Sequence, residues 1–248
     1  MEAMLRLHFG PVKYIIAIFS SAAAANPWSE DCPLCLAPAD HGLLCDPCHG
    51  AMERIGAACE RCALRLDLAG VDCPVCRHAS FAFDRAVARF DYRFPLDRLV
   101  QRFKYGADLA LGSSLARALA DRLEREPRVD LLVVPPLSAA RLRERGFNQA
   151  LEIAHVVGRR LRVPVAREAI VRTRETGAQA ALGRAARRAN VRGAFACTGA
   201  LDGARVAIVD DVLTTGATMD AIAQALKSAG AAQVAAWALA RAPDPEAP

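Results

Sequence analysis

Four Cys-x-x-Cys pairs constrain this chain more than any other feature of its sequence. They hold eight of the nine cysteines, namely Cys32, Cys35, Cys45, Cys48, Cys59, Cys62, Cys73 and Cys76. Each pair places two thiolates at the spacing of a tetrahedral zinc site, and two pairs complete a shell of four sulfurs. A shell made only of sulfur leaves no position for water. The pattern therefore predicts two structural zinc ions rather than a catalytic one.

The sequence leaves two questions open about these metal sites. Pairing of neighbouring Cys-x-x-Cys units is the simplest scheme, and an interleaved scheme is the alternative. His41, His49 and His78 lie close enough along the chain to compete as ligands, although a full cysteine set favours surface positions for them. Cys197 stands alone and is expected to be a small buried side chain.

The cysteine spacing also bears on the cellular compartment. A secreted protein uses such residues as a disulfide framework, whereas repeated zinc pairs indicate a reducing, cytoplasmic environment. Residues 1–30 favour export instead, because apolar residues from Tyr14 to Phe19 precede an alanine run, as in a short signal peptide. An extended N-terminus or a short helix on the zinc module is the alternative. We expect a cytoplasmic protein and treat 1–30 as an extension of uncertain role.

After Phe83 the pattern changes to alternating strands and helices. A half-buried strand is expected at Val87–Tyr92, followed by an amphipathic helix after Pro95 and a second helix from Leu109 to Leu123. Two short apolar runs, Leu131–Val134 and Val206–Val209, have the composition of central parallel strands. Helices are expected at Asn148–Leu161 and Thr218–Ala229, and a last strand at Val234–Leu239. This order predicts an α/β domain whose ligands bind beyond the carboxyl ends of the strands.

The positive charge of the chain is concentrated in one segment. The whole chain carries 32 basic and 27 acidic residues, and Arg141–Arg192 alone holds 13 basic and 4 acidic ones, whereas Asp31–Phe83 holds 4 and 7. This concentration favours an anionic ligand such as a phosphate, a pyrophosphate or a nucleic-acid backbone. The alternative is a compositional bias, since 29 of the 32 cations are arginine. Aromatic residues make up only 6% of the chain, which disfavours a large base-stacking surface.

The segment from Val206 to Thr218 combines a buried strand, two adjacent carboxylates and a hydroxyl-rich turn that opens a helix. Free backbone N–H groups at a helix N-terminus, three threonine hydroxyls and a glycine form a cradle for a monophosphate. Asp210 and Asp211 are suited to accept hydrogen bonds from the two vicinal hydroxyls of a ribose. Together they predict a site for ribose 5-phosphate.

This segment resembles the phosphoribosyl-pyrophosphate (PRPP) signature of type I phosphoribosyltransferases. Further motifs resemble the ComF family, which joins a double zinc ribbon to such a domain: Lys104-Tyr105-Gly106, Arg141-Leu-Arg-Glu-Arg145-Gly-Phe-Asn-Gln149, Arg172-x-Thr-x-x-x-x-Gln179-x-x-Leu182 and Arg188-x-Asn190. The resemblance implies a zinc-ribbon module at 31–80 and a type I phosphoribosyltransferase fold with a central parallel sheet at 84–242.

The resemblance also implies roles for individual residues. Asp210 and Asp211 correspond to the catalytic acids that hold the ribose, and the 5-phosphate loop comprises Leu213, Thr214, Thr215, Gly216, Ala217 and Thr218. The pyrophosphate loop corresponds to Pro136, Leu137 and Ser138, with Arg141 and Arg145 neutralising the pyrophosphate unless they form a solvated helix face. The stretch from Thr173 to Asn190 resembles a mobile hood, or is a surface loop.

Two functions remain open. The family resemblance implies a PRPP-binding protein of natural transformation on the cytoplasmic side, with single-stranded DNA, DNA-uptake proteins or a second copy of the chain as partners. The alternative is an active transferase that uses PRPP with Mg²⁺ to pentosylate a base or amine, in nucleotide or gluconate-related metabolism. No residue of the sequence identifies the acceptor.

Overall fold

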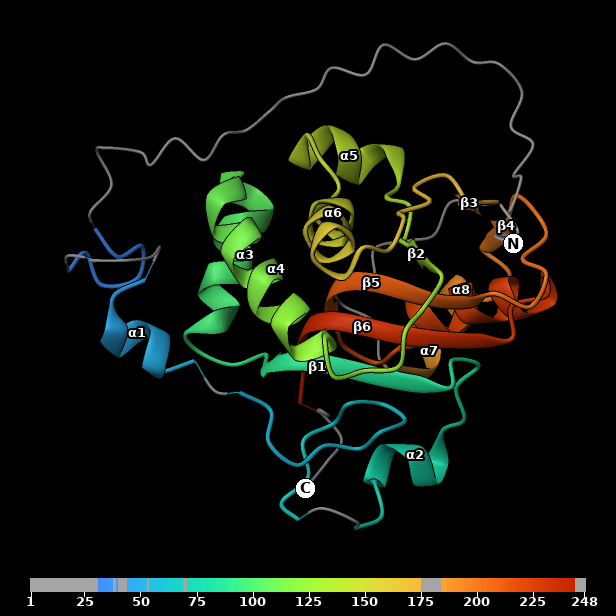
Figure 1. The fold of residues 1–248 in the computed structure, drawn as a ribbon, viewed down its shortest axis with the longest axis horizontal. Helices are drawn as coiled ribbons and strands as arrows, with labels where there is room; N and C mark the ends of the chain where they lie inside the picture. The colour runs from blue at the N-terminus through green and yellow to red at the C-terminus, as the bar shows by residue number, and fades with distance from the viewer. Residues whose placement is uncertain are drawn as a thin grey trace, which may run out of the picture.

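The computed structural model describes residues 31–37, 39, 44–52, 54–68, 71–174 and 184–243. Its centre is a four-stranded parallel sheet in the order β1-β6-β5-β2 (Figure 1). The strands are β1 (Arg85–Asp91), β2 (Leu131–Val133), β5 (Arg205–Leu213) and β6 (Gln233–Arg241). This arrangement confirms the predicted α/β class with a central parallel sheet.

Helices cover both faces of the sheet (Figure 1). One face carries α3 (Leu96–Gly106), α4 (Leu109–Leu123) and α6 (Gln149–Leu161), and the other carries α8 (Ala217–Ser228), against which α7 (Arg184–Val191) packs. The alternation of the β5 side chains supplies both cores, because Val206 and Ile208 join one cluster while Ala207 and Val209 join the other. A strand buried in this way needs the continuous apolar run that the sequence shows.

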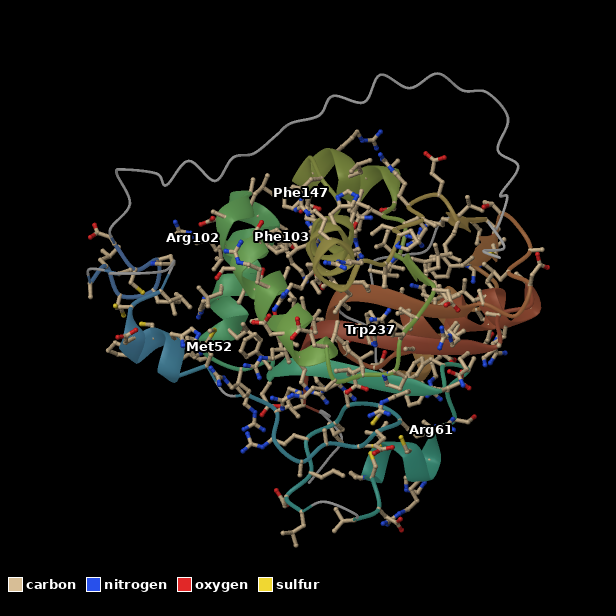
Figure 2. The ribbon with its side chains drawn as sticks, in the orientation of Figure 1. Met52, Arg61, Arg102, Phe103, Phe147 and Trp237 are labelled. Atoms are coloured by element: carbon tan, nitrogen blue, oxygen red, sulfur yellow. The ribbon has the colours of Figure 1, made fainter. Side chains whose placement is uncertain are left out.

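The predicted helices form where their apolar stripes and caps require them. In α3, Leu99, Val100 and Phe103 are completely buried, and Figure 2 shows Phe103 facing Phe147, with 5.6 Å between the ring centroids. The side chain of Asp108 caps α4 by accepting a hydrogen bond from the Leu111 amide at 3.0 Å. Helices α4 and α6 therefore match their predicted bounds to within one residue, and α3 begins directly after Pro95 as expected.

Strand β1 differs from its prediction. Alternation predicted a half-buried strand, but Ala86 and Ala88 lie in one core and Val87 in the other. Its outer edge is also occupied, because the Ala86 amide donates to the Glu60 carbonyl at 2.9 Å and the Ile55 amide to the Arg89 carbonyl at 3.2 Å. The cysteine-rich segment thus covers the sheet edge, which the local pattern of β1 does not reveal.

Strand β2 was predicted to be central, and that prediction is wrong for the described sheet. It lies at the end of the strand order, and its outer side contacts the backbone of residues 164–166. The Leu132 amide donates to the Pro164 carbonyl at 2.9 Å, and the Leu132 carbonyl accepts from Ala166 at 2.8 Å. A protected edge is as apolar as a central position, so composition does not distinguish them.

Several elements were not predicted. They are α5 (Ala139–Arg145), α7, and the antiparallel pair β3 (Ile170–Arg172) and β4 (Phe195–Cys197). Helix α7 corrects the reading of 184–190 as a loop, because alanine and arginine are good helix formers and the helix packs against α8. Residues 175–183, including Gln179 and Leu182, lie outside the described residues. Cys197 is half-buried rather than buried, and its thiol donates to the Gly199 carbonyl at 3.3 Å.

The cysteine-rich segment lies on two different parts of the domain. Its short helix α1 (Asp46–Gly50) lies beside α3, and α2 (Pro74–His78) lies below β1 in the view of Figure 1. Figure 2 shows Met52 and Arg102 on the side of α1, and Arg61 on the side of α2. Residues 1–30, with the signal-like segment, lie outside the described residues.

Candidate functional site

The two acids of the motif lie where β5 approaches the carboxyl edge of the sheet. Asp210 pairs in register with Ala238 of β6, and β2 runs parallel to β5 on its other side, with Val133 opposite Ile208. The residues that follow β2 therefore emerge at the same edge as the acids. This juxtaposition is the one that open α/β sheets use to bind ligands.

The turn after β5 forms the expected loop at the start of a helix. Gly216 is the N-cap of α8 and has a φ of +78°, a left-handed conformation that favours glycine. Thr214 is exposed, Thr218 is half-buried, and the buried Thr215 hydroxyl accepts a hydrogen bond from the Ala217 amide at 3.4 Å. The N-terminus of this twelve-residue helix favours an anion, as a phosphate loop requires.

Lys104 joins the acid pair from α3. Its Nζ lies 2.9 Å from Oδ2 of Asp211, and both side chains are largely buried. Burial acts to lower the pKa of Lys104, but the charges of Asp211 and Asp210 outweigh it and raise that pKa above its ordinary value. Lys104 is therefore charged at neutral pH and neutralises Asp211.

Asp210 is in a different electrostatic state from its neighbour. Burial and the adjacent charge of Asp211 raise the pKa of Asp210 to about 7, although Lys104 and Arg141 act in the opposite direction. The Asp211 amide donates to Oδ1 of Asp210 at 2.8 Å. The pair thus contains one carboxylate with a cationic partner and one carboxyl that titrates near neutral pH, a combination suited to bind neutral hydroxyl groups.

The loop after β2 and helix α5 contribute the arginines of the predicted pyrophosphate site. Pro136, Leu137 and Ser138 are half-buried, and the Ser138 hydroxyl accepts from the Arg141 amide at 3.3 Å as the cap of α5. Arg141 lies near enough to Asp210 to influence its pKa. Arg145 donates to Gln149 Oε1 at 3.1 Å and to the Tyr105 hydroxyl at 3.2 Å. Arg145 is thus fixed by protein contacts rather than forming a freely solvated face.

Sequence reasoning assigned no role to three residues of this region. Lys104 and Tyr105 are the last side chains of α3 before its terminal glycine, and each contacts one of the motif residues. The signal for Lys104 and Tyr105 was their place in the ComF-like motif Lys104-Tyr105-Gly106, which indicated a resemblance but no role. Arg241, buried at the end of β6, donates to the carbonyls of Leu213 and Thr214 in the loop. An arginine that follows an apolar strand gives no signal of such contacts.

Two surface hollows formed by the described residues lie away from this site. One is lined by His49, Met52 and Arg65 among others, and a second lies around Glu126 and Trp237. Neither contains a residue of the acid pair or its loop. The site is therefore identified by its motif and its contacts.

The eight paired cysteines form two separate groups of four. Cys32, Cys35, Cys45 and Cys48 make the first cluster, and Cys59, Cys62, Cys73 and Cys76 make the second cluster. Within each group all sulfur atoms lie within 4.8 Å of one another. Neighbouring pairs therefore share a site, which decides against interleaving. No histidine belongs to a metal-binding group among the described residues, and His41 lies outside them.

The sulfur geometry fits zinc. Cys35 and Cys45 are 3.5 Å apart, as are Cys62 and Cys73, and Cys59 and Cys76 are 3.7 Å apart. Zn–S bonds of about 2.3 Å in a tetrahedron require sulfur separations of about 3.8 Å. Each cluster can therefore hold one structural zinc ion with no vacant position.

The described residues include no helix with both the length and the apolar character needed to cross a membrane.

Comparisons with known proteins show the family to which the chain belongs. A family model described as "Phosphoribosyl transferase domain" matches residues 115–248. The chain is 34% identical over 218 residues to "DNA utilization protein YhgH" of Escherichia coli O157:H7, covering 85% of this chain and 96% of the relative. It is 31% identical over 206 residues to "Competence protein F" of Haemophilus influenzae, with coverages of 79% and 90%.

A third relative is "Competence protein ComFC" of Streptococcus pneumoniae, 28% identical over 205 residues, with coverages of 82% and 89%. Among solved structures, a purine phosphoribosyltransferase from Pyrococcus horikoshii Ot3 is 24% identical over 52% of this chain and 72% of that chain. The TM-score of this match is 0.32.

Proposed function

We propose that this chain, which belongs to the ComF family of phosphoribosyltransferase-domain proteins, binds PRPP and acts in DNA uptake or DNA utilisation on the cytoplasmic side of the membrane. The observation that carries the proposal is the arrangement at the sheet edge, where an acid pair, a helix-opening loop and the segment after β2 meet. Each of these parts matches one chemical group of PRPP.

The ribose would lie against the acids. Asp211, partnered by Lys104, accepts a hydrogen bond from one hydroxyl, and Asp210 accepts from the other. The 5-phosphate would accept hydrogen bonds from the backbone N–H groups of the loop at Thr214–Thr218. The pyrophosphate would face Pro136, Leu137 and Ser138, with Arg141 supplying positive charge.

Mg²⁺ would enter as part of the Mg²⁺–PRPP complex, as a counter-ion of the pyrophosphate. The acid pair fits a direct magnesium site poorly, because Lys104 already neutralises Asp211 and Asp210 is partly protonated near neutral pH. No step of the proposal depends on a metal ion held by these carboxylates.

The test is a calorimetric titration of the full-length protein with PRPP and Mg²⁺. Asp210→Asn combined with Asp211→Asn is expected to weaken binding by at least about 100-fold, because an amide oxygen accepts more weakly than a carboxylate and the amide NH₂ faces the ribose hydroxyls with a donor, while Lys104 loses its partner. Asp130→Asn is the matched control, since Asp130 pairs with Arg205 at the opposite end of β5. Unchanged affinity in the double variant would refute the assignment of the site.

An active transferase is the second candidate, favoured by the family match across the entire loop. In that reaction the acceptor lone pair forms a bond to the anomeric carbon while the carbon–oxygen bond to pyrophosphate breaks and its electrons leave with pyrophosphate. The acceptor then loses a proton. The acids would hold the ribose and the arginines would stabilise the departing charge.

Pyrophosphate release measured with a panel of nucleobases and amines distinguishes the two candidates. Release with one acceptor, abolished in the double Asp variant, establishes catalysis. Tight PRPP binding without release from any acceptor supports a ligand-binding role.

A role with DNA draws on the names of the relatives and on the basic segment Arg141–Arg192. Single-stranded DNA affinity is expected to fall steeply with salt and to decrease when the exposed Arg143 is replaced by alanine. Arg188 suits this test less well, because two of its guanidinium nitrogens are buried and it lies over the Phe81 ring. A salt-independent affinity would contradict direct DNA binding.

A further inference from the structure

We propose that the second cluster sets the shape of the phosphate loop, and that Arg241 is the positioning residue that connects them. This inference rests on the proposed PRPP site and deepens it. It assigns the two zinc clusters different tasks: the second controls ligand affinity, and the first does not.

Arg241 makes the most direct connection. Its guanidinium is buried at the end of β6, with 3% of the residue exposed. Nε donates to the carbonyl of Cys62, a second-cluster ligand, at 2.9 Å. Nη1 donates to the carbonyls of Leu213, at 3.1 Å, and of Thr214. One rigid, planar group thus joins the backbone of the metal-binding turn to the first residues of the loop.

Phe81 makes a second connection. It follows the last cysteine of the second cluster and packs beside Gly216, where a Cβ atom would come within 2.8 Å of its ring. The Phe81 carbonyl also accepts from Arg61, which lies between Cys59 and Cys62, at 3.1 Å. The ring therefore contacts the residue that caps α8 while its backbone contacts the metal-binding turn.

Asp220 makes a third connection, from the first turn of α8. Its Oδ1 accepts from the Ala82 amide at 2.6 Å, so the segment that leaves the second cluster is attached to the helix that opens at the phosphate loop. Three independent contacts converge on residues 213–220. A change in the cysteine turn would therefore alter the direction of the loop N–H groups.

The first cluster has different surroundings. Its described contact with the domain is a weak hydrogen bond from Arg102 to the Pro33 carbonyl, at 3.5 Å, together with the packing of Leu34 and Leu44 near Met52. These residues face α3 and not the phosphate loop. Both clusters can bind zinc, but the second alone has described contacts with the loop.

The coupling is reciprocal by thermodynamic necessity. If loading of the second cluster tightens PRPP binding, PRPP must tighten metal binding at the second cluster by the same factor. This reciprocity provides a readout that does not depend on catalysis.

The first experiment substitutes Arg241→Lys in the full-length protein, with Arg205→Lys as control. Arg205 lies at the other end of β5 and pairs with Asp130 on the surface. Arg241→Lys is expected to retain about two zinc ions per chain. It should weaken the binding of PRPP about tenfold and speed amide hydrogen exchange at residues 214–217. Exchange in α4 and α6 should not change.

The second experiment compares Cys76→Ser with Cys48→Ser, because these two ligands are the last of their clusters and both are half-buried. Each variant should lose one zinc ion. Cys76→Ser is expected to weaken the binding of PRPP at least tenfold and to speed amide hydrogen exchange at residues 214–217. Cys48→Ser should match wild type in both measurements. Zinc release by a chelator should slow in the presence of PRPP at the second cluster only.

The outcomes separate this inference from the proposed function. If wild-type protein binds no PRPP, the proposed function fails, while faster loop exchange in Arg241→Lys and Cys76→Ser would still support the structural coupling. Loop exchange equal to wild type in both variants would overturn the inference, whatever the PRPP affinity. Equal effects of Cys48→Ser and Cys76→Ser would also overturn it.

Discussion

The two cysteine clusters have the same ligands and nearly the same spacing, yet they are integrated into the molecule to very different degrees. The buried residues Cys62 and Cys73 belong to the same hydrophobic cluster as Val206 and Ile208 of the sheet. The first cluster takes Cys48 from α1, a helix that contains no buried residue. Identical metal chemistry therefore serves a core element in one case and a peripheral attachment in the other, and packing makes the difference.

The largest expected effect comes from removing equivalent buried ligands. Cys45 and Cys73 are the third cysteines of their clusters and are similarly buried, at 7% and 8% exposure. Cys73→Ser is expected to lower the free energy of unfolding by more than about 5 kcal/mol, because metal binding and core packing are lost together. Cys45→Ser should leave the unfolding of the sheet nearly unchanged. Urea denaturation followed by circular dichroism, with zinc analysis, measures both.

Equal loss of stability in the two serine variants would contradict the contrast between the clusters. A Cys73→Ser variant with two bound zinc ions would instead remove Cys73 from the ligand set.

The next effect concerns apolar packing beside each cluster. Phe81 is buried and stacks on Phe83 at 4.7 Å between centroids, so Phe81→Ala should cost about 3–5 kcal/mol. Replacing Leu34, which is half-buried beside the first cluster, by alanine should lower the free energy of unfolding by about 1 kcal/mol. Similar midpoints of chemical denaturation for the two variants would show that the second cluster is less integrated than its contacts indicate.

A glycine in each region allows a finer comparison. Gly216 has a positive φ and lies against Phe81. Gly216→Ala should therefore lower the free energy of unfolding by about 2 kcal/mol and weaken the binding of PRPP. Gly50, at the end of α1, has no atom within 4 Å of the place that a Cβ would occupy, and Gly50→Ala should change stability by less than about 0.5 kcal/mol. Thermal unfolding and calorimetry measure both effects, and a neutral Gly216→Ala would argue against close contact with Phe81.

The smallest effect is a pH dependence that arises at the acid pair, next to the loop. The folded-state pKa of Asp210 is raised from 3.8 to about 7. Its stabilising contribution to the free energy of unfolding is therefore present below pH 4 and is lost as the pH rises toward 7. Wild-type stability should therefore fall relative to Asp210→Asn between pH 5 and pH 7, by roughly 1 kcal/mol given partial exposure and coupling to Asp211.

Asp130 provides a control of opposite sign. Hydrogen bonds from Arg205 lower the pKa of Asp130, so its contribution is present at neutral pH and is lost as the pH falls through the lowered pKa. Asp130→Asn should therefore lose stability relative to wild type at neutral pH and approach it in acid. Parallel pH curves for wild type and Asp210→Asn would contradict the raised pKa of Asp210.

Sequence alone determined the parts of this protein that depend on local spacing. Four Cys-x-x-Cys pairs in one short segment indicate zinc by their spacing alone, and the predicted clusters are confirmed as two groups of four sulfurs. The apolar run before Asp210 and the amphipathic stripe of α3 likewise specify a buried strand and a helix. The roles assigned to the acids and the loop remain predictions for the experiments above.

Tertiary structure decided which distant segments meet. The pairing of Lys104 with Asp211 and the contacts of Arg241 with Cys62 join residues more than 100 positions apart, and no local periodicity encodes them. The same holds for the sheet edge that the cysteine-rich segment covers at Ala86. Spacing along the chain governs local geometry, whereas long-range contacts follow from how whole elements pack.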